Sequence, residues 1–248
     1  MRSHTIYVII GDIAIKLYQK TFWTLHYISG PSVSGTITGM TQIFLARHGE
    51  TEWNAIRRVQ GWTDIPLSAK GVAQAKALGK RLENVPLSAV YSSDLSRALE
   101  TARPAALYHQ LSPIPLPDMR EKSFGEWEGL TQCDLERNYP ELWHRYHHER
   151  DMNAIVPGGE TWPQVQARIR SALHLILDQH PGSDDCVLVV GHGGSGRIIL
   201  LEALQAELST LLRLHLDNAS LSRLDFRSQE DCRILFLNDT SHLSEARP

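Results

Sequence analysis

Cysteine is scarce in this chain. The 248 residues include only Cys133, Cys186 and Cys232, which are widely spaced and form no Cys-x-x-Cys pair. Zinc sites built from thiolates need such closely spaced pairs, so a site of this kind is not expected. The simplest expectation is three reduced, buried thiols in a cytoplasmic protein.

Long apolar runs and an excess of one charge are also missing. No apolar run approaches the ~20 residues of a transmembrane helix, so no membrane partner is expected. The net charge of -3 supplies no global basic field, which argues against nucleic acid as a main partner. Any phosphate site must therefore be a local concentration of positive charge. The apolar content of 42% is that of an ordinary soluble globular protein with one large domain or two small ones.

Residues 1–39 differ in character from the rest of the chain. The apolar run that starts at Ile6 ends after five residues, fewer than the ~7–15 of a signal peptide. Met40 directly precedes the first clear strand. We expect 1–39 to be a poorly ordered extension or a start-site artefact, and 40–248 to form the folded domain.

A polar stretch follows the first apolar strand. Residues 42–45 are typical of a buried strand, and after Ala46 come Arg47 and His48. Gly49 allows the backbone to turn, and Thr51 can cap a helix. Arg47 and His48 should therefore lie at the carboxyl end of a strand and beside a helix N-terminus, where ligands and anions bind.

Capping residues and amphipathic patterns predict the main helices. Helices are expected from Ser68 to about Glu83, from Thr161 to about Gln179, and over 198–204.

Arg97 is expected in the first turn of another helix, capped by Ser93 or Asp94 after a strand at 89–92. A cation there opposes the helix dipole at a cost of roughly 0.3–1 kcal/mol. Either Arg97 forms a surface ion pair, for example with Glu100, or an anion lies between it and the helix terminus. The residues alone favour the surface pair.

The segment 119–129 brings three carboxylates, Glu121, Glu126 and Glu128, close to two aromatic residues. An aromatic wall desolvates a carboxyl group and favours its neutral form, which a general acid needs. The alternative is a solvated surface loop, and composition does not choose between them.

Residues 130–150 predict one or two helices broken near Pro140. His144, His147 and His148 share one helical face there, so two of them could bind a metal. No acidic third ligand accompanies them, and we favour a solvated helix without metal.

The strongest strand, 187–190, ends in a glycine-rich stretch. Residues 191–196 match the dinucleotide fingerprint Gly-x-Gly-x-x-Gly. A dinucleotide domain needs further alternating strands and helices, whereas the roughly fifty remaining residues predict an antiparallel pair, 220–226 and 233–237. The stretch also carries His192, which a pyrophosphate site does not require. We therefore favour another role for it.

Four motifs together resemble the histidine phosphatase superfamily, the phosphoglycerate-mutase-like group, in the family's order and over residues 42 to about 243. They are Arg47-His48-Gly49-Glu50-Thr51 with Asn54, the segment 91–102 that contains Arg97, the segment around Glu121, and His192 with its glycines. The resemblance implies an α/β fold, a three-layer α/β/α sandwich with a mostly parallel central sheet and an antiparallel edge strand.

The resemblance also implies a catalytic set. His48 would be the nucleophile that forms a phosphohistidine, neutral, with its other ring nitrogen donating to a fixed acceptor such as a backbone carbonyl. Arg47 and Arg97 would grip phosphoryl oxygens, and a protonated His192 would stabilise the transition state. Glu121 would protonate the leaving alkoxide and then activate water.

Further substrate-binding candidates are Asn54, Gln60, Gly61 and Gly193. Gln60 lies twelve residues after His48, where family phosphatases carry a residue that faces substrate. No cofactor is implied.

We therefore expect a metal-independent phosphomonoesterase acting on a small-molecule phosphate ester. One alternative is a phosphoglycerate mutase, but cofactor-dependent mutases carry a longer basic insertion than the short, mixed segment 121–157. Alpha-ribazole phosphatase is a specific possibility within the phosphatase branch. A non-catalytic scaffold would predict a broken catalytic set, whereas this set is intact. A homodimer remains open.

Overall fold

The computed structural model describes residues 5–10, 13–18, 26–27, 39–181 and 185–246. The chain divides into two compact units, Met1–Ile37 and Thr38–Pro248. In the first unit, β2 (Ile13–Tyr18) pairs antiparallel with both β1 (Thr5–Ile10) and β3 (His26–Tyr27). The expectation that residues 1–39 are a poorly ordered extension lies largely outside the described residues and stays a prediction.

The second unit is built on a six-stranded sheet in the order β6-β5-β7-β4-β8-β9. Its strands are β4 (Thr41–Arg47), β5 (Leu87–Ser92), β6 (Ile114–Pro115), β7 (Cys186–Gly191), β8 (Leu221–Phe226) and β9 (Cys232–Asp239). Strands β4 to β7 run parallel, while β8 is antiparallel to both of its neighbours. The predicted parallel sheet with an antiparallel edge is confirmed.

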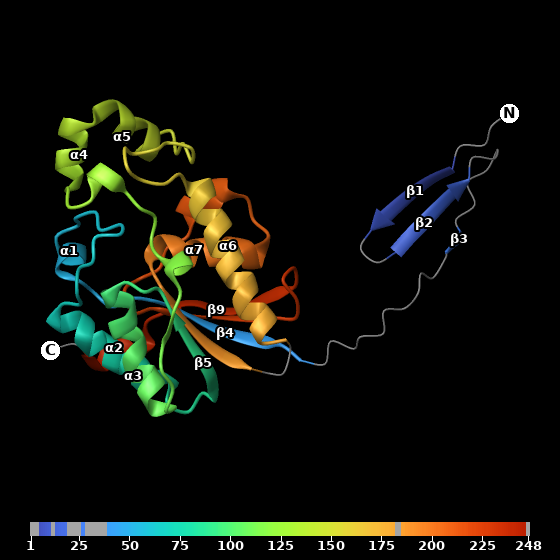
Figure 1. Ribbon diagram of the computed structural model, residues 1–248, viewed down its shortest axis with the longest axis horizontal. Coiled ribbons are helices and arrows are strands. Elements are labelled where there is room, and N and C mark those ends of the chain that lie inside the picture. Colours follow the sequence, from blue (N-terminus) through green and yellow to red (C-terminus); the bar gives the residue numbers. More distant parts are fainter. Residues whose placement is uncertain (1–4, 11–12, 19–25, 28–38, 182–184, 247–248) are drawn as a thin grey trace. The chain divides into compact units, whose positions relative to one another are not determined.

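Helices cover both faces of this sheet (Figure 1). They are α2 (Ala69–Leu82) and α3 (Ser96–Tyr108) on one face, and α6 (Trp162–Gln179) and α7 (Gly193–Leu204) on the other. Side chains alternate along a strand, so Ile43 and Leu45 of β4 pack in the core with α6 and α7. Phe44 and Ala46 pack in the second core with α2 and α3. The chain therefore has the three expected layers.

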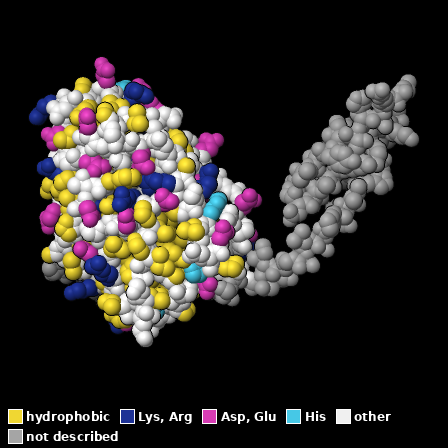
Figure 2. Space-filling model, in the orientation of Figure 1, with side chains coloured by type: hydrophobic (Ala, Val, Ile, Leu, Met, Phe, Trp, Pro, Cys, Tyr) yellow, Lys and Arg dark blue, Asp and Glu magenta, His cyan; other side chains and the backbone are white. Residues whose placement is uncertain are grey.

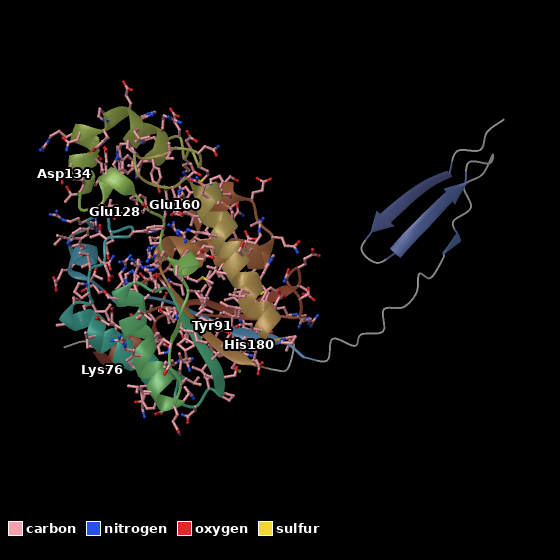
Figure 3. The ribbon with its side chains drawn as sticks, viewed as in Figure 1. Lys76, Tyr91, Glu128, Asp134, Glu160 and His180 are labelled. Atoms are coloured by element: carbon pink, nitrogen blue, oxygen red, sulfur yellow. The ribbon has the colours of Figure 1, made fainter. Side chains whose placement is uncertain are left out.

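The end of α6 is tied to the sheet by His180. Its Nε2 atom lies 3.0 Å from the Tyr91 hydroxyl on β5, and its carbonyl accepts a hydrogen bond from Thr41 on β4. Figure 3 shows Tyr91 and His180 next to each other at this end of α6. These bonds fix the end of α6 against two strands of the sheet.

A third, smaller core lies under helices α4 and α5. The elements outside the three layers are α1 (Glu52–Ala55), α4 (Gln132–Asn138), α5 (Pro140–His147) and four 3₁₀ helices, η1 (Pro117–Met119), η2 (Gly125–Trp127), η3 (Leu208–Arg213) and η4 (Ser241–Ala246). Trp127, Leu135 and Val156 are buried together there and belong to neither face of the sheet. The predicted break near Pro140 is confirmed.

Two helix starts differ from the prediction. Helix α3 begins after Leu95, and its N-terminal cap comes from Asp64, whose Oδ1 accepts bonds from the backbone N–H and the hydroxyl of Ser96 at 2.9 and 2.8 Å. Capping by Ser93 or Asp94 is therefore wrong. Helix α7 already begins at Gly193, because the Ser195 hydroxyl accepts the His192 N–H at 2.9 Å and closes the first turn.

The cysteines and the surface complete the description. Of the three cysteines only Cys186 is buried, and the expectation of a buried thiol is wrong for Cys133, which is exposed on α4. No helix among the described residues is long and apolar enough to cross a membrane. Charged side chains of both signs are interspersed over the face seen in Figure 2, so no basic field covers that face.

Candidate active site

The candidate site lies at the carboxyl ends of the central strands β4 and β7. Arg47 is the last residue of β4 and His48 follows it, while His192 follows β7 and precedes α7. The His48 N–H donates to the Gly191 carbonyl at 2.9 Å. Because the two strands are hydrogen-bonded neighbours, the two imidazole rings meet edge to face with centroids 5.1 Å apart.

His48 is held as a neutral imidazole. Its Nδ1 lies 2.7 Å from the Gly49 carbonyl, and since a carbonyl only accepts, Nδ1 carries the proton and donates it. This carbonyl is the fixed acceptor that the sequence analysis expects. Burial, together with the charges of Arg97 and Arg47, lowers the pKa of His48 well below its ordinary value. The Nε2 lone pair is therefore available to attack an electrophile.

Arg97 is fully buried, with 0% of its surface exposed. Its two terminal nitrogens donate to the carbonyls of Gly61 at 2.7 Å and Thr63 at 3.0 Å, and its Nε lies 3.3 Å from His192 Nδ1. The surface ion pair considered for Arg97 is therefore wrong. Burial lowers the pKa of Arg97 to about 10, so its guanidinium stays charged at neutral pH.

The bond from Arg97 fixes the tautomer of His192. An arginine Nε–H only donates, so His192 Nδ1 accepts and Nε2 carries the proton. Burial and the charge of Arg97 lower the pKa of His192 well below its ordinary value. The expectation of a protonated His192 is therefore wrong for this state, because burial and the neighbouring arginines oppose a second proton on the imidazole. It can still donate through Nε2–H.

Three buried polar atoms of the candidate residues have no hydrogen-bond partner among the described residues. They are Arg47 Nε, Gln60 Oε1 and His192 Nε2. Arg47 is anchored by its Nη1, which donates to the Leu216 carbonyl at 2.6 Å. Unpaired buried polar groups are rare and costly in folded proteins. These atoms are therefore the ones to which a ligand can bind most favourably.

Asn54 serves first as a helix cap. Its Oδ1 accepts the N–H and hydroxyl of Thr51, both at 3.1 Å, and the Asn218 side-chain amide at 3.2 Å. These bonds fix the side chain, so only its Nδ2 remains as a donor for a ligand. Contact between Asn54 and substrate stays a prediction.

The Glu121 carboxyl group is fixed by two backbone N–H groups. Lys122 N–H donates to Oε1 and Gly194 N–H donates to Oε2, both at 2.8 Å. A Cβ on Gly194 would lie 2.0 Å from Oε1, whereas one on Gly193 would lie 3.9 Å from Oε2. Gly194, which the sequence analysis does not single out, therefore allows Glu121 to approach α7. The two adjacent glycines, Gly193 and Gly194, were the feature of the sequence that could have indicated this close approach.

Arg168 holds the chain that leads into Glu121. Its guanidinium donates to the carbonyls of Asp118, Arg120 and Glu121 at 2.7–2.8 Å, and it pairs with Glu160 at 2.8 Å. Arg168 was not predicted from the sequence, because its contacts join α6 to a loop far away in the sequence.

Glu128 joins two loops of the site. Its carboxylate accepts the N–H groups of Trp62, Thr63 and Phe124 at 2.8–3.0 Å and the Thr63 hydroxyl at 2.6 Å. Gly61 has a φ of +57°, and a Cβ there would lie 2.1 Å from Glu128 Oε1. Figure 3 labels Glu128 together with Glu160, whose carboxylate accepts the neighbouring N–H of Ser123. Gly61 thus has a structural role, and its contact with substrate stays a prediction.

Three aromatic rings surround Lys122, the residue that follows Glu121. The Lys122 ammonium lies 5.1–5.9 Å from the ring centroids of Phe124, Tyr146 and Trp162, and it donates to the Glu160 carbonyl. Burial lowers the pKa of Lys122 to about 8.

Comparison with known proteins gives the family. A family model of the histidine phosphatase superfamily, branch 1, matches residues 43–240. The chain belongs to this superfamily. A metal-independent phosphoserine phosphatase of Arabidopsis thaliana is 38% identical, over 83% of this chain and 84% of its own. A protein of Proteus mirabilis named "Probable phosphoglycerate mutase GpmB" is 32% identical, over 83% and 96%. The solved structure of Bacillus stearothermophilus YhfR is 32% identical with a TM-score of 0.74, over 82% and 99%.

Membership in the histidine phosphatase superfamily decides between two readings of residues 191–196. Because the family match covers this stretch, the dinucleotide fingerprint is a coincidence of glycine spacing, and the role of His192 as the family's second histidine stays a prediction. Gly193, Gly194 and Gly196 lie within the first turns of α7 and do not form a separate loop.

Three exposed histidines lie together at the carboxyl end of α5. His148 lies 5.2 Å from His144 and 5.0 Å from His147, measured between ring centroids. His144 also pairs with Glu149 at 3.2 Å. In the described part of the chain, no group of three or more His, Cys, Asp or Glu residues is arranged to hold a metal ion.

Proposed function

We propose that the chain is a metal-independent phosphomonoesterase that hydrolyses small phosphorylated metabolites through a phosphohistidine on His48. The observation that carries this proposal is the state of His48. Its ring is buried, its Nδ1–H is held by the Gly49 carbonyl, and its pKa is lowered, so Nε2 is a neutral nucleophile at physiological pH.

The phosphoryl group binds at the end of β4. A phosphomonoester carries about −1.5 to −2 charges at pH 7. Arg47 and Arg97 supply positive charge, Arg47 Nε is an unpaired buried donor, and His192 offers its Nε2–H. His192 therefore acts as a neutral hydrogen-bond donor in the free enzyme, and the dianion favours its protonation once bound.

Phosphoryl transfer to the enzyme is the first step. His48 Nε2 forms a bond to phosphorus as the bond from phosphorus to the ester oxygen breaks. The protonated carboxyl group of Glu121 gives its proton to that oxygen, and the alcohol leaves.

Hydrolysis of the phosphohistidine is the second step. A water oxygen forms a bond to phosphorus while its proton passes to the Glu121 carboxylate. The bond between phosphorus and Nε2 breaks, which restores neutral His48 and protonated Glu121. General acid–base catalysis of this kind is worth about 10²–10⁴-fold.

The relatives support a phosphomonoester as the substrate. The relative at 38% identity is named a metal-independent phosphoserine phosphatase. The relative named a probable phosphoglycerate mutase favours a second candidate, in which the phosphoryl group returns to another hydroxyl of the same product. Alpha-ribazole phosphatase, whose Shigella flexneri structure has a TM-score of 0.72 to this chain, is the specific activity to include in a substrate panel.

The test is phosphate release in the presence of a chelator. The panel contains p-nitrophenyl phosphate, phosphoserine, 3-phosphoglycerate and alpha-ribazole phosphate. The native protein should release phosphate, and His48→Ala should lower the rate by at least about 10³-fold, as expected for loss of a nucleophile. His174→Ala, on the outer part of α6, is the matched control and should retain activity.

Two outcomes contradict the phosphatase proposal. Full activity of His48→Ala would exclude the phosphohistidine. Conversion of 3-phosphoglycerate into 2-phosphoglycerate without phosphate release would replace the phosphatase by the mutase.

A further inference from the structure

We propose that Arg168, paired with Glu160, is a positioning residue that holds the Glu121 carboxyl group in place for proton transfer to the leaving group. This inference rests on the proposed function, in which Glu121 is the proton donor. It adds to the reaction two residues that act through Glu121 rather than on the substrate.

Arg168 uses all of its hydrogen-bond donors within the protein. A guanidinium group has five N–H donors in a planar fork. Nε donates to Glu160 Oε1 at 2.8 Å, and Nη2 donates to Glu160 Oε2 and to the Glu121 carbonyl, both at 2.8 Å. Nη1 donates to the carbonyls of Asp118 at 2.8 Å and Arg120 at 2.7 Å. Five donors thus meet five acceptors of the described chain, so Arg168 holds protein groups rather than a ligand.

Glu160 binds the segment that follows Glu121. Its Oε2 accepts the Ser123 N–H at 2.8 Å, and its own N–H donates to the Ser123 carbonyl at 3.0 Å. Its carbonyl accepts a hydrogen bond from the Lys122 ammonium. Arg168 therefore holds the chain up to Glu121, and Glu160 holds the chain after it. The pair fixes the backbone on both sides of the proton donor.

The peptide group between Glu121 and Lys122 carries this restraint to the carboxyl group. Its carbonyl oxygen accepts from Arg168 at 2.8 Å and from the Trp62 indole N–H at 2.7 Å. Its N–H, which is that of Lys122, donates to Glu121 Oε1 at 2.8 Å. Because a peptide group is planar, fixing its carbonyl also fixes the direction of its N–H. Arg168 therefore orients one of the two hydrogen bonds that hold the carboxyl group, and Gly194 supplies the other.

The helix that carries Arg168 is itself fixed in the core. Val165 and Ile169 of α6 are fully buried in the core on the α6 and α7 face of the sheet. Glu121, by contrast, lies in an irregular segment between η1 and η2. Groups on a helix of the scaffold are placed more precisely than groups on a loop. Arg168 therefore gives Glu121 a fixed position that the irregular segment alone does not provide.

Glu160 keeps the Arg168 cation paired where both side chains are largely buried. The two side chains are 15% and 18% exposed and pair at 2.8 Å, and a buried charge without a partner is costly. Burial raises the pKa of Glu160, but the hydrogen bonds from Arg168 and Ser123 outweigh this effect and lower the pKa below its ordinary value. The pair therefore stays ionised at neutral pH, and its bonds to the backbone persist.

The experiment compares two esters that differ in their need for the proton. Phosphoserine has an alkoxide leaving group, whereas p-nitrophenolate is a stable anion that leaves without a proton. We measure kcat/KM for both esters with the native protein, Arg168→Met and Arg168→Lys. Arg170→Met is the matched control, because it removes an arginine of the same helix that pairs with Glu202 at 2.7 Å and is 51% exposed.

Arg168→Met should lower kcat/KM for phosphoserine by about 10²-fold, the cost of misplacing a catalytic group by about 1 Å. It should lower kcat/KM for p-nitrophenyl phosphate much less. Arg168→Lys keeps the charge but loses the planar fork, so its ratio of kcat/KM between the two esters should be intermediate. Arg170→Met should keep the native ratio. If Arg168→Met does not fold, Arg168→Lys decides alone.

A double-mutant cycle tests whether Arg168 acts through Glu121. Glu121→Gln removes the proton donor, so adding Arg168→Met should lower kcat/KM for phosphoserine no further. Full additivity of the two losses would overturn the proposal, because Arg168 would then act through another group or through the fold.

Failure of this inference is distinct from failure of the proposed function. If the native protein hydrolyses both esters and Arg168→Met either keeps the native ratio or loses activity on both esters equally, the positioning role alone is overturned. If the native protein hydrolyses neither of these esters nor any other of the panel, the proposed function is overturned, and the positioning role with it.

Discussion

Gly194→Ala tests whether the close approach of α7 to Glu121 is what places the proton donor. The added Cβ would lie 2.0 Å from Glu121 Oε1 and 2.9 Å from Cη2 of Trp162. Non-bonded atoms of this kind lie ~3.5–4.0 Å apart at their optimum. The carboxyl group must therefore move by more than about 1 Å, and it loses the Gly194 N–H bond of 2.8 Å. A misplacement of that size costs about 10²-fold in rate.

The leaving group makes the assay specific. An alkoxide needs the proton from Glu121, whereas p-nitrophenolate is a stable anion that leaves without one. Gly194→Ala should therefore lower kcat/KM by about 10²-fold for an alkyl phosphate such as phosphoserine. It should lower kcat/KM much less for p-nitrophenyl phosphate.

Gly193→Ala is the matched control for the position of the proton donor, because its Cβ would lie 3.9 Å from Glu121 Oε2 and 3.6 Å from Arg47 Nε. It leaves the Glu121 carboxyl group in place, so any loss of activity through weaker phosphoryl binding should be equal for both esters. The ratio of kcat/KM between the alkyl ester and p-nitrophenyl phosphate should therefore keep its native value. Alanine in place of a helical glycine stabilises a protein by roughly 0.5–1 kcal/mol. A variant that is less active but not less stable in thermal unfolding therefore has a misplaced Glu121 and not a damaged fold. The reasoning is refuted if the two variants change this ratio equally while both remain folded.

Three further predictions concern buried charges. The pKa of Lys122 is lowered by burial to about 8, so above pH 8 the unfolded chain binds more protons than the native chain. The free energy of unfolding should therefore rise by up to about 3 kcal/mol toward pH 10.5. Urea unfolding should show this rise in the native protein and not in Lys122→Met. The pKa values of His48 and His192 are also lowered, so below pH 6.5 the unfolded chain binds more protons than the native chain. The free energy of unfolding should then fall by up to about 1.4 kcal/mol per pH unit for each histidine. In His192→Ala the free energy of unfolding should fall less steeply with decreasing pH. Glu128→Ala leaves three backbone N–H groups without their acceptor, so it should lower the free energy of unfolding in urea by about 2–3 kcal/mol. It should also raise KM for phosphate esters, because the carbonyls that accept hydrogen bonds from Arg97 become less fixed. Glu128→Gln should cause smaller changes in both quantities.

The layered fold was predictable because its signals are local. The continuous apolar run 187–190 indicates a strand covered on both faces, and β7 is such a strand, with every residue buried. Ser68 and Thr161 accept bonds from N–H groups three residues ahead, at 3.1 and 3.4 Å, as caps do. Information of this kind lies within a few residues and can be read without tertiary contacts.

The start of α3 was not predictable in this way. Asp94 and Ser93 have the right chemistry for a cap, but the acceptor comes from Asp64 in another loop, while Asp94 pairs with Arg120 at 2.6 Å. Arg168 was missed for the same reason, since it reaches carbonyls 47–50 positions away in the sequence. Local chemistry identifies groups that can cap or bind but not the partners that the fold supplies.

The charge state of His192 was wrong for a different reason. A sequence shows that arginines are present, but not that His192 is fully buried or that Arg97 Nε points at its Nδ1. Burial determines the protonation state of His192, since desolvation is the largest effect on the pKa of this imidazole.

The small core under α4 and α5 is separate from the cores on the two faces of the sheet, so the residues that pack in it can be substituted without changing the strands that lead to His48 and His192. Trp127, Leu135 and Val156 form a cluster of their own, and in the segment 130–156 only Tyr146 and Met152 are among the apolar residues that pack against the core on the α6 and α7 face. The rest of this segment can therefore change its shape and composition with little repacking of the layers that hold His48 and His192. Within one family, substrate preference can then change through substitutions in this segment. Chimaeras that exchange it between relatives should keep phosphoryl transfer and change only what is dephosphorylated.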